Sequence, residues 1–92
     1  MSAPDYSLLR AEAERFLGQT RFLNVQKFVE AATESPDQYP ETYNLVSTRS
    51  PQGIKRHINH AVLKHKPGFK QWNRPTHGTS WAVYQRVVPD AD

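Results

Sequence analysis

The chain has 92 residues, of which 37% are hydrophobic and 23% are charged. This length allows one domain, and the composition is too apolar for a disordered chain. The sequence has no cysteine, which excludes disulfide bonds and thiolate metal sites. It does not begin with a basic segment followed by an apolar run, and no stretch approaches the ~18 apolar residues of a membrane span. We therefore expect one domain over residues 1–92, ordered over about residues 5–88, that is soluble and cytoplasmic.

The formal net charge of +3 conceals two halves of opposite sign. Residues 1–47 hold seven acidic and four basic residues, a formal charge of −3. Residues 48–92 hold eight basic residues against Asp90 and Asp92 alone, a formal charge of +6. No carboxylate lies between Thr48 and Pro89, and a surface of one sign attracts polyanions. The basic half therefore indicates a nucleic acid or another polyanion as partner, although a basic side can also serve solubility alone.

A first amphipathic helix is predicted over residues 6–17. Asp5 is a favourable N-cap for it, and Gly18 supplies a stop. Apolar residues recur within it at spacings of three and four, and these are Leu9, Ala13, Phe16 and Leu17. Arg10 and Glu14 lie one turn apart on the opposite face. We expect that outer face to be solvated and to be a candidate surface for a partner subunit.

The next elements are a short strand, a second helix and an ambiguous segment. Residues 21–23 could pair as a brief strand before Asn24, which is a favourable cap for a helix over residues 25–34. Residues 36–41 contain two prolines and no periodicity, which is typical of a loop. Residues 42–48 fit either a short extended segment or a helical turn that leads into the third helix.

The third helix, predicted over residues 51–66, has the best start signal in the chain. Ser50 is a favourable N-cap and Pro51 falls at the first helical position, where its missing N–H costs nothing. Its apolar side consists of Ile54, Ile58, Ala61 and Val62, with His65 beside them. The opposite side carries Gln52, Arg56, Asn59, His60 and Leu63, flanked by Lys55 and Lys66. Pro67-Gly68 ends the helix.

A β-hairpin is predicted after this helix, with arms at residues 69–74 and 80–88 and a tip at residues 75–79. The second arm is rich in β-branched and aromatic residues. Trp72 and Trp81 have two interpretations. They could pair across the hairpin and add area to a small core, or they could stack on the exposed bases of a single strand. The pairing is the more common use of such residues in a small hairpin.

Three helices followed by a hairpin, with the basic residues in the last helix and the hairpin, resemble a winged helix-turn-helix DNA-binding domain. The resemblance is one of element order and charge placement, and it covers residues 6–17, 21–23, 25–34, 51–66 and 69–88. It implies an α+β fold of three helices with a C-terminal β-hairpin wing. The long connection over residues 36–50 departs from the family, in which a tighter turn usually joins the two helices of the motif. It leaves open which helix precedes the recognition helix.

If the resemblance holds, the last helix enters the major groove. Four of its side chains could then contact base edges: Gln52, Lys55, Arg56 and Asn59. Seven residues would contact phosphates: Arg49, Ser50, Lys64, Lys66, Lys70, Arg74 and His77. The tip from Arg74 to Thr79 could lie on the backbone or reach a minor groove. As an alternative, an outer face of Lys, Arg and Asn is also what an ordinary solvated helix presents.

The sequence thus predicts a double-stranded DNA-binding protein that acts as a transcriptional regulator or an accessory DNA-organising factor. We expect it to bind as a homodimer or cooperatively, and we expect no enzymatic activity, cofactor, metal or membrane. His57, His60 and His65 have no Cys or carboxylate close in sequence to complete a metal site. Two alternatives remain open. One is a protein-interaction module with a basic docking face, and the other is a small basic ribonuclease-type toxin that depends on His57 or His60.

Overall fold

The computed structural model describes residues 4–72 and 81–87. The helices within these ranges are α1 (Tyr6–Leu17), α2 (Val25–Glu34), α3 (Pro40–Thr48) and α4 (Pro51–Asn59). A π-helical turn, η1 (His60–Lys64), continues α4, and the strands are β1 (Phe22–Asn24), β2 (Phe69–Gln71) and β3 (Val83–Arg86). The predicted α+β class is confirmed. The prediction of three helices was wrong, because α3 is a fourth.

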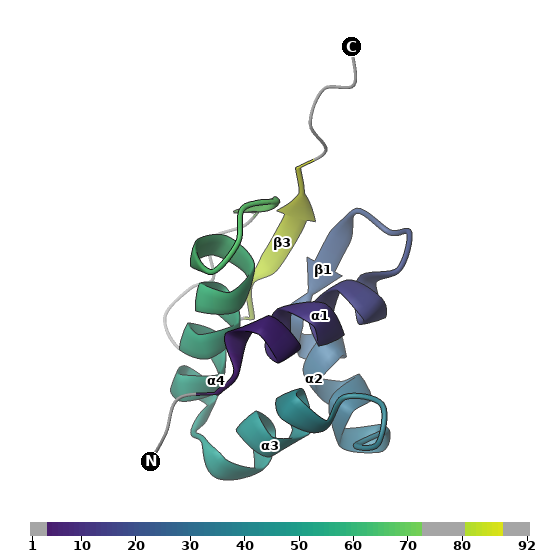
Figure 1. Cartoon of the computed structure of the whole chain (residues 1–92), viewed down its shortest axis with the longest axis vertical. Coiled ribbons are helices and arrows are strands. Elements are labelled where there is room, and N and C mark those ends of the chain that lie inside the picture. Colours follow the sequence, from purple (N-terminus) through teal and green to yellow (C-terminus); the bar gives the residue numbers. More distant parts are fainter. Residues whose placement is uncertain (1–3, 73–80, 88–92) are drawn as a thin grey trace.

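The sheet and the helices form two layers that meet at α1 (Figure 1). The three strands are antiparallel in the order β1-β3-β2, so the second hairpin arm is the central strand. Helix α1 crosses the middle of the molecule and contacts β1 on one side and α3, α4 and η1 on the others. The predicted hairpin is confirmed in its paired arms, whereas its tip at residues 75–79 lies outside the described residues.

The first two helices begin and end where the sequence predicts. The carboxylate of Asp5 accepts a hydrogen bond from the Leu8 N–H at 3.2 Å, and Gly18 follows the helix with φ of 59°. The side chain of Asn24 accepts from the Lys27 N–H at 3.2 Å at the start of α2. These caps are local in sequence, and for that reason the predicted bounds of 6–17 and 25–34 agree with the structure. The brief strand is also present, one residue later than predicted.

Helix α3 corrects the prediction for residues 36–48. The helix begins at Pro40, inside the predicted loop, and its N-cap residue Tyr39 makes no capping bond with its side chain. The cap comes instead from α1: the buried carboxylate of Glu12 accepts from the N–H groups of Glu41 at 2.9 Å and Thr42 at 2.8 Å. The same carboxylate accepts from the Thr42 hydroxyl at 2.7 Å. A cap that is 29 residues distant in sequence has no local signature.

The connection between α3 and α4 is only two residues long, Arg49 and Ser50. The hydroxyl of Ser50 accepts from the Gly53 N–H at 3.3 Å, as expected for the N-cap of α4. The helix that directly precedes α4 is therefore α3, and the long connection over residues 36–50 is mostly helical. The two helices meet through a tight turn.

The predicted helix over residues 51–66 ends earlier and changes its winding. Regular α-helix stops at Asn59, and η1 follows with a backbone bond from the His65 N–H to the His60 carbonyl at 2.8 Å. A π-helical turn of this kind is rare and releases carbonyl groups from their usual partners. It also shifts the angular phase of the residues after it. His65, predicted on the apolar side, is consequently exposed and lies 3.3 Å from the Ser7 hydroxyl.

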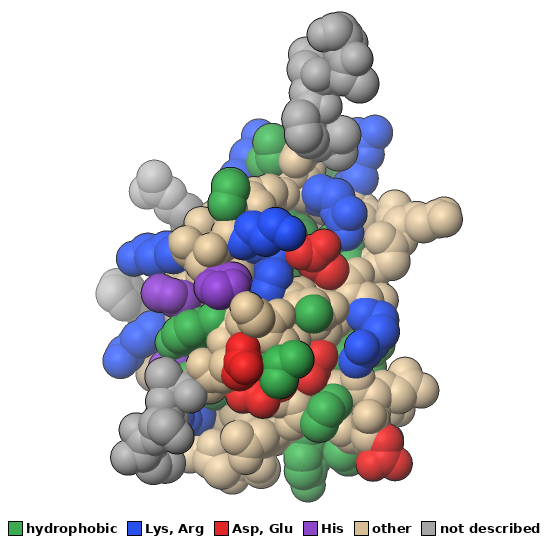
Figure 2. Space-filling view, in the orientation of Figure 1, with side chains coloured by type: hydrophobic (Ala, Val, Ile, Leu, Met, Phe, Trp, Pro, Cys, Tyr) green, Lys and Arg blue, Asp and Glu red, His purple; other side chains and the backbone are tan. Residues whose placement is uncertain are grey.

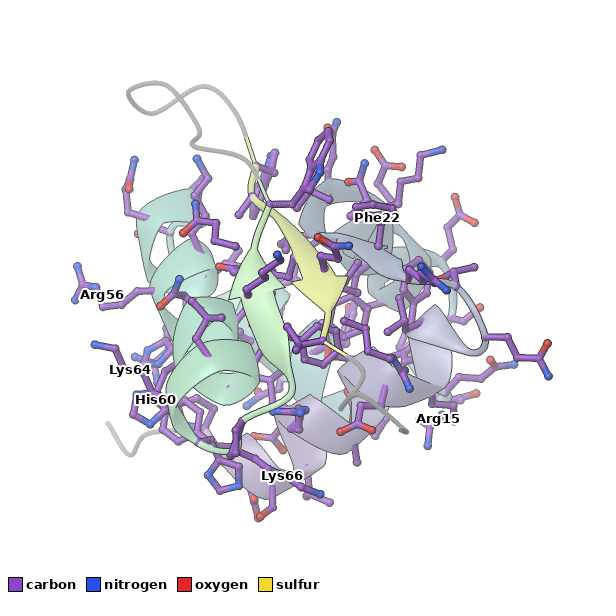
Figure 3. All side chains as sticks on the ribbon, turned by 90° about the horizontal axis from the view of Figure 1, so that it is seen from above. Arg15, Phe22, Arg56, His60, Lys64 and Lys66 are labelled. Atoms are coloured by element: carbon purple, nitrogen blue, oxygen red, sulfur yellow. The ribbon has the colours of Figure 1, made fainter. Side chains whose placement is uncertain are left out.

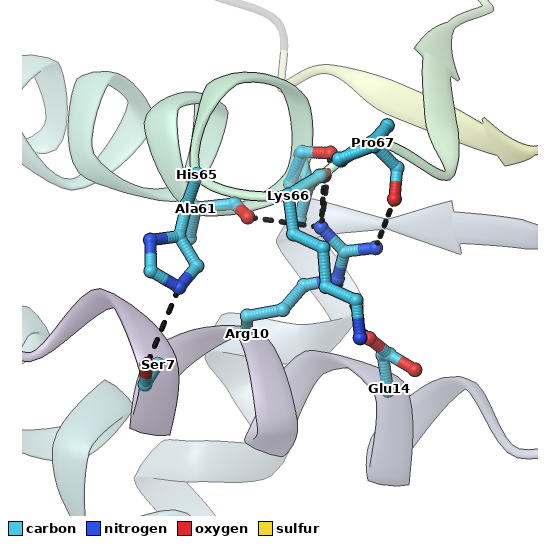
Figure 4. Close-up of polar contacts among 8 residues, drawn as sticks. Ser7, Arg10, Glu14, Ala61, His65, Lys66 and Pro67 are labelled. Carbon is cyan, nitrogen blue, oxygen red and sulfur yellow. Dashed lines mark hydrogen bonds and ion pairs between the residues drawn. The ribbon is translucent and has the colours of Figure 1, made fainter.

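Arg10 of α1 satisfies carbonyl groups of η1 and of the two residues that lead toward β2 (Figure 4). Its guanidinium donates to four carbonyl oxygens: those of Ala61 at 3.2 Å, Val62 at 3.4 Å, Lys66 at 2.5 Å and Pro67 at 3.1 Å. It also pairs with Glu14 at 2.7 Å and lies 4.9 Å from the centre of the Phe69 ring. Arg10 is only 5% exposed. The prediction that Arg10 lies on a solvated outer face was wrong.

The hydrophobic core lies between α1, the other helices and the inner face of the sheet. Its fully buried members include Leu9, Leu23, Phe28, Leu45, Ile58, Val62 and Tyr84. Leu63, which the sequence leaves without a role, is half-buried and packs against this core. The predicted apolar residues of α4 and η1 are all buried. No helix in residues 4–72 and 81–87 is long and apolar enough to cross a membrane.

Candidate nucleic-acid interface

The four predicted base-contacting residues lie together on α4. Gln52 and Arg56 are exposed, whereas Lys55 and Asn59 are half-buried. All four line a cavity of about 330 Å³ between α4 and the sheet. The floor and far wall of this cavity are formed by Val25, Gln71, Ala82 and Tyr84. The side of α4 next to the sheet therefore forms a concave surface with polar and basic walls, to which the exposed Gln52 and Arg56 contribute.

Two of these four residues have partners within the protein. The Asn59 side-chain amide donates to the Tyr84 hydroxyl at 2.9 Å, and the Lys55 ammonium lies 5.0 Å from the centre of the Trp81 ring. Burial raises the pKa of Tyr84, and the hydrogen bond from Asn59 partly opposes that rise. The phenol is therefore neutral at physiological pH. Asn59 and Lys55 therefore link α4 to β3 and to Trp81, which precedes β3, whereas Gln52 and Arg56 remain available to a ligand.

The predicted phosphate contacts do not form one cluster. Lys64 and Lys66 are exposed at the end of the helix. In Figure 3 Lys64 lies on the side that carries Arg56, whereas Lys66 lies at the lower edge of the view. Lys70 is exposed on β2. Ser50 serves as the N-cap of α4, and Arg49 is half-buried. The remaining two candidates, Arg74 and His77, lie outside the described residues.

The charge division of the sequence is visible on the surface. In the view of Figure 2, acidic side chains gather over the middle of the face, and Lys and Arg lie along its upper part and its left edge beside the histidines. The acidic residues Glu12 and Glu14 of α1 are engaged with α3 and Arg10, respectively. The basic edge is the one formed by α4 and η1. A polyanion would meet that edge first.

Three histidines surround Tyr6 of α1. The Tyr6 hydroxyl lies 2.7 Å from Nδ1 of His57, and the Tyr6 ring centre lies 4.1 Å from that of His60 and 6.4 Å from that of His65. Burial lowers the pKa of His57, and the positive charges of Arg49 and Arg56 lower it further. Within residues 4–72 and 81–87, no group of three or more His, Cys, Asp or Glu residues could hold a metal ion. The rings of His57 and His60 thus join α1 to α4.

Two basic residues that sequence reasoning missed lie near Lys70. Arg21 and Arg86 line a second cavity of about 270 Å³ with Lys70, Gln85 and Val87. The strand register explains this grouping, because Lys70 pairs with Gln85 and Phe69 pairs with Arg86. Strict alternation would place Lys70 and Arg86 on opposite faces of the hairpin, so the sequence pattern does not indicate that they line one cavity. Arg21 has no signal in the sequence either, because it precedes a strand on the other side of β3.

Comparison of the chain with family models, with curated proteins and with solved structures finds no match.

Proposed function

We propose that the protein binds double-stranded DNA through the outward face of α4. In this proposal α4 enters the major groove, and the hairpin at residues 69–88 lies along the duplex as a wing. The protein acts as a transcriptional regulator or an accessory DNA-organising factor. The observation that carries the proposal is the position of Gln52 and Arg56. They are one helical turn apart and both exposed, and Figure 3 shows Arg56 on the basic edge of the molecule.

The chemistry of these two side chains fits base edges. An Arg guanidinium can donate twice to O6 and N7 of guanine, and a Gln amide can both donate to and accept from adenine. Lys64 lies on the same side as Arg56, and Lys66 is exposed farther along, at the end of the helix. Both would contact phosphates, which gives affinity that depends on salt. No acidic residue of the basic half opposes them, because residues 48–89 contain none.

The local architecture around α4 also supports the proposal. The turn between α3 and α4 is two residues long, slightly shorter than the roughly three or four residues of a typical helix-turn-helix motif, so the two helices are adjacent as that motif needs. Arg10 holds the carbonyls of Lys66 and Pro67, and this fixes the path from η1 into β2. The hairpin therefore stands at a defined position beside α4. The fold resembles the winged helix-turn-helix arrangement with one helix, α3, added before the recognition helix.

The test is a fluorescence-anisotropy titration with a mixed-sequence duplex at several salt concentrations. We expect binding whose affinity falls steeply as salt rises, because a slope of about −0.9 in log K against log[salt] accompanies each phosphate contact. The variant Arg56→Ala should weaken binding by about tenfold or more. Arg15→Ala is the matched control, since Arg15 carries the same charge on the opposite side of the molecule (Figure 3). Binding that is insensitive to salt, or equal in the two variants, would overturn the proposal.

We further propose that binding is cooperative or dimeric, because one small domain offers a limited interface. Leu8 of α1 is 52% exposed and is a candidate subunit contact. Sedimentation velocity on free and duplex-bound protein measures this directly. A 1:1 complex at all concentrations, with a non-cooperative isotherm, would exclude a dimer.

A further inference from the structure

The outer face of the sheet carries a patch that DNA binding by α4 does not use. Side chains alternate between the two faces of each strand, and Leu23, Phe69 and Tyr84 point inward to the core. The side chains between them therefore point outward: Phe22 and Asn24 from β1, Val83 and Gln85 from β3, and Lys70 from β2, followed by Trp72. Figure 3 shows this face toward the viewer, with Phe22 at its edge and α4 to one side.

Two large aromatic side chains stand next to each other on this face. Trp72 is 60% exposed and Phe22 is 45% exposed, although both belong to residue types that a small protein would normally bury. Their ring centres are 5.5 Å apart with planes at 76°, an edge-to-face contact that reaches across β3. In such a pair the edge of one ring covers a single face of the other, so most of the aromatic surface is open. The pair forms a platform on which a flat ring could stack.

The platform lies beside positive charge. Phe22 and Lys70 flank Gln85 in the strand register, on opposite sides of the central strand. Lys70 lines the cavity of about 270 Å³ together with Arg21. Arg86 also lines this cavity, but its guanidinium lies over the inward-facing Phe69 ring at 5.8 Å. None of the three strands contains an acidic residue. Aromatic planes next to a cavity lined by Lys70 and Arg21 are complementary to nucleobases joined by phosphates.

We propose that the outer face of the sheet binds a single-stranded nucleic acid, with a base stacked on Trp72 and Phe22 and a neighbouring phosphate held by Arg21 and Lys70. A duplex does not fit this role, because its bases are stacked on one another and are closed to an aromatic plane. The surface is separate from the outward side chains of α4, Gln52 and Arg56. The protein thus has two nucleic-acid surfaces, and the second takes unpaired strands.

The test uses the Trp81→Phe protein, in which Trp72 is the only tryptophan. This protein is titrated with an oligothymidylate, an oligouridylate, and an abasic strand of the same length that retains the phosphates. We expect the two base-bearing strands to quench Trp72 fluorescence and to bind more tightly than the abasic strand. Trp72→Ala, made in the full chain and read by anisotropy of a labelled strand, should weaken binding about 5- to 150-fold, the range that alanine substitution gives for one stacked base.

Matched variants separate stacking from charge. Phe22→Leu should weaken strand binding, whereas Tyr43→Leu should not, since Tyr43 is an exposed aromatic residue on α3 at the other end of the molecule. Lys70→Gln should reduce the salt slope by about 0.7, the value for one phosphate contact with a single strand. Trp72 and Phe22 are exposed, so these variants are expected to fold, and circular dichroism checks this.

The outcomes distinguish this proposal from duplex binding by α4. Arg56→Ala should impair duplex binding and leave the oligothymidylate unaffected, whereas Trp72→Ala should do the reverse. Equal affinity for the abasic strand would show a phosphate surface only and would overturn the proposal. Dimerisation that Trp72→Ala abolishes, without strand binding, would assign the face to a second copy of the chain and would also overturn it.

Discussion

Replacing Arg10 by methionine should destabilise the protein by about 3 kcal/mol, because two buried carbonyl oxygens then lose their donor at roughly 1–3 kcal/mol each. Those oxygens belong to Ala61 and Val62, and both contacts are buried. Methionine refills part of the volume and removes the desolvation cost of the guanidinium, which keeps the net loss in the lower half of the resulting range of about 2–6 kcal/mol. A domain of this size is stable by about 5–14 kcal/mol, so the variant should still fold.

Urea unfolding followed by circular dichroism measures this loss, and the thermal midpoint should fall by about 12–24 °C. Arg15→Met is the control, because Arg15 belongs to the same helix and is exposed. Arg10→Lys should recover only part of the loss, since an ammonium cannot reach four carbonyls as a planar fork does. If Arg10→Met cost no more than Arg15→Met, the carbonyl network would not be what holds η1 in place.

A double-mutant cycle with Gly68 sharpens the same prediction. Gly68 has φ of 135°, and a Cβ atom there would lie 2.8 Å from Nη2 of Arg10. Gly68→Ala should therefore destabilise the protein in two ways, through backbone strain and through displacement of the guanidinium. In the Arg10→Met background only the strain remains. The two losses should add to more than the double variant shows, and strict additivity would contradict the contact.

Two further outcomes follow from the buried polar contacts. Glu12→Ala should lower the free energy of unfolding in urea by about 2–4 kcal/mol, because two backbone N–H groups and a hydroxyl lose a charged acceptor. Glu30→Ala, on the exposed side of α2, is the control and should change it by almost nothing. The folded-state pKa of His57 is lowered below its ordinary 6.5, so the unfolded chain binds this proton more readily and stability should fall as pH decreases below about 6.5. The urea unfolding midpoint, measured at pH 7.5 and at pH 5.5, checks this. His57→Gln should reduce the difference between the two midpoints. An equal difference in the variant and in the unchanged protein would exclude His57 as its source.

The elements that the sequence predicts correctly are those whose determinants are local. Asp5 and Gly18 delimit α1, and Asn24 caps α2 three residues before its bonding partner. Helix α3 escapes prediction because its cap, Glu12, comes from another helix. The π-helical turn escapes for the same reason, since Arg10 stabilises its carbonyls from a distance of about fifty residues in sequence. Helical periodicity places Arg10 correctly opposite the apolar stripe, but it does not show that a second element covers that side.

The candidate site is predictable in its position and less so in its detail. Charge placement locates the basic edge and the face of α4, and the four proposed base-contacting residues do lie together. The bonds of Asn59 to Tyr84 and of Lys55 to Trp81 depend on how β3 docks, which helical periodicity does not contain. The packing of β3 against its neighbours also determines which residues the two tryptophans contact. Trp72 contacts Phe22, and Trp81 contacts Lys55, so the expected pairing of the two tryptophans gives way to contacts with other elements.

Helix α1 places two charged residues of the acidic half inside the fold. Its polar side chains point into the molecule: Glu12 starts α3, Arg10 ends η1, and Tyr6 binds His57 on α4. These three contacts fix both ends of the α3–α4 pair relative to one scaffold. The acidic half therefore uses Glu12 and Arg10 to build the fold, while the basic half leaves Arg56, Lys64 and Lys70 exposed. Apolar contacts alone would define the direction of α4 less well. They would also define the spacing between α4 and the hairpin less well.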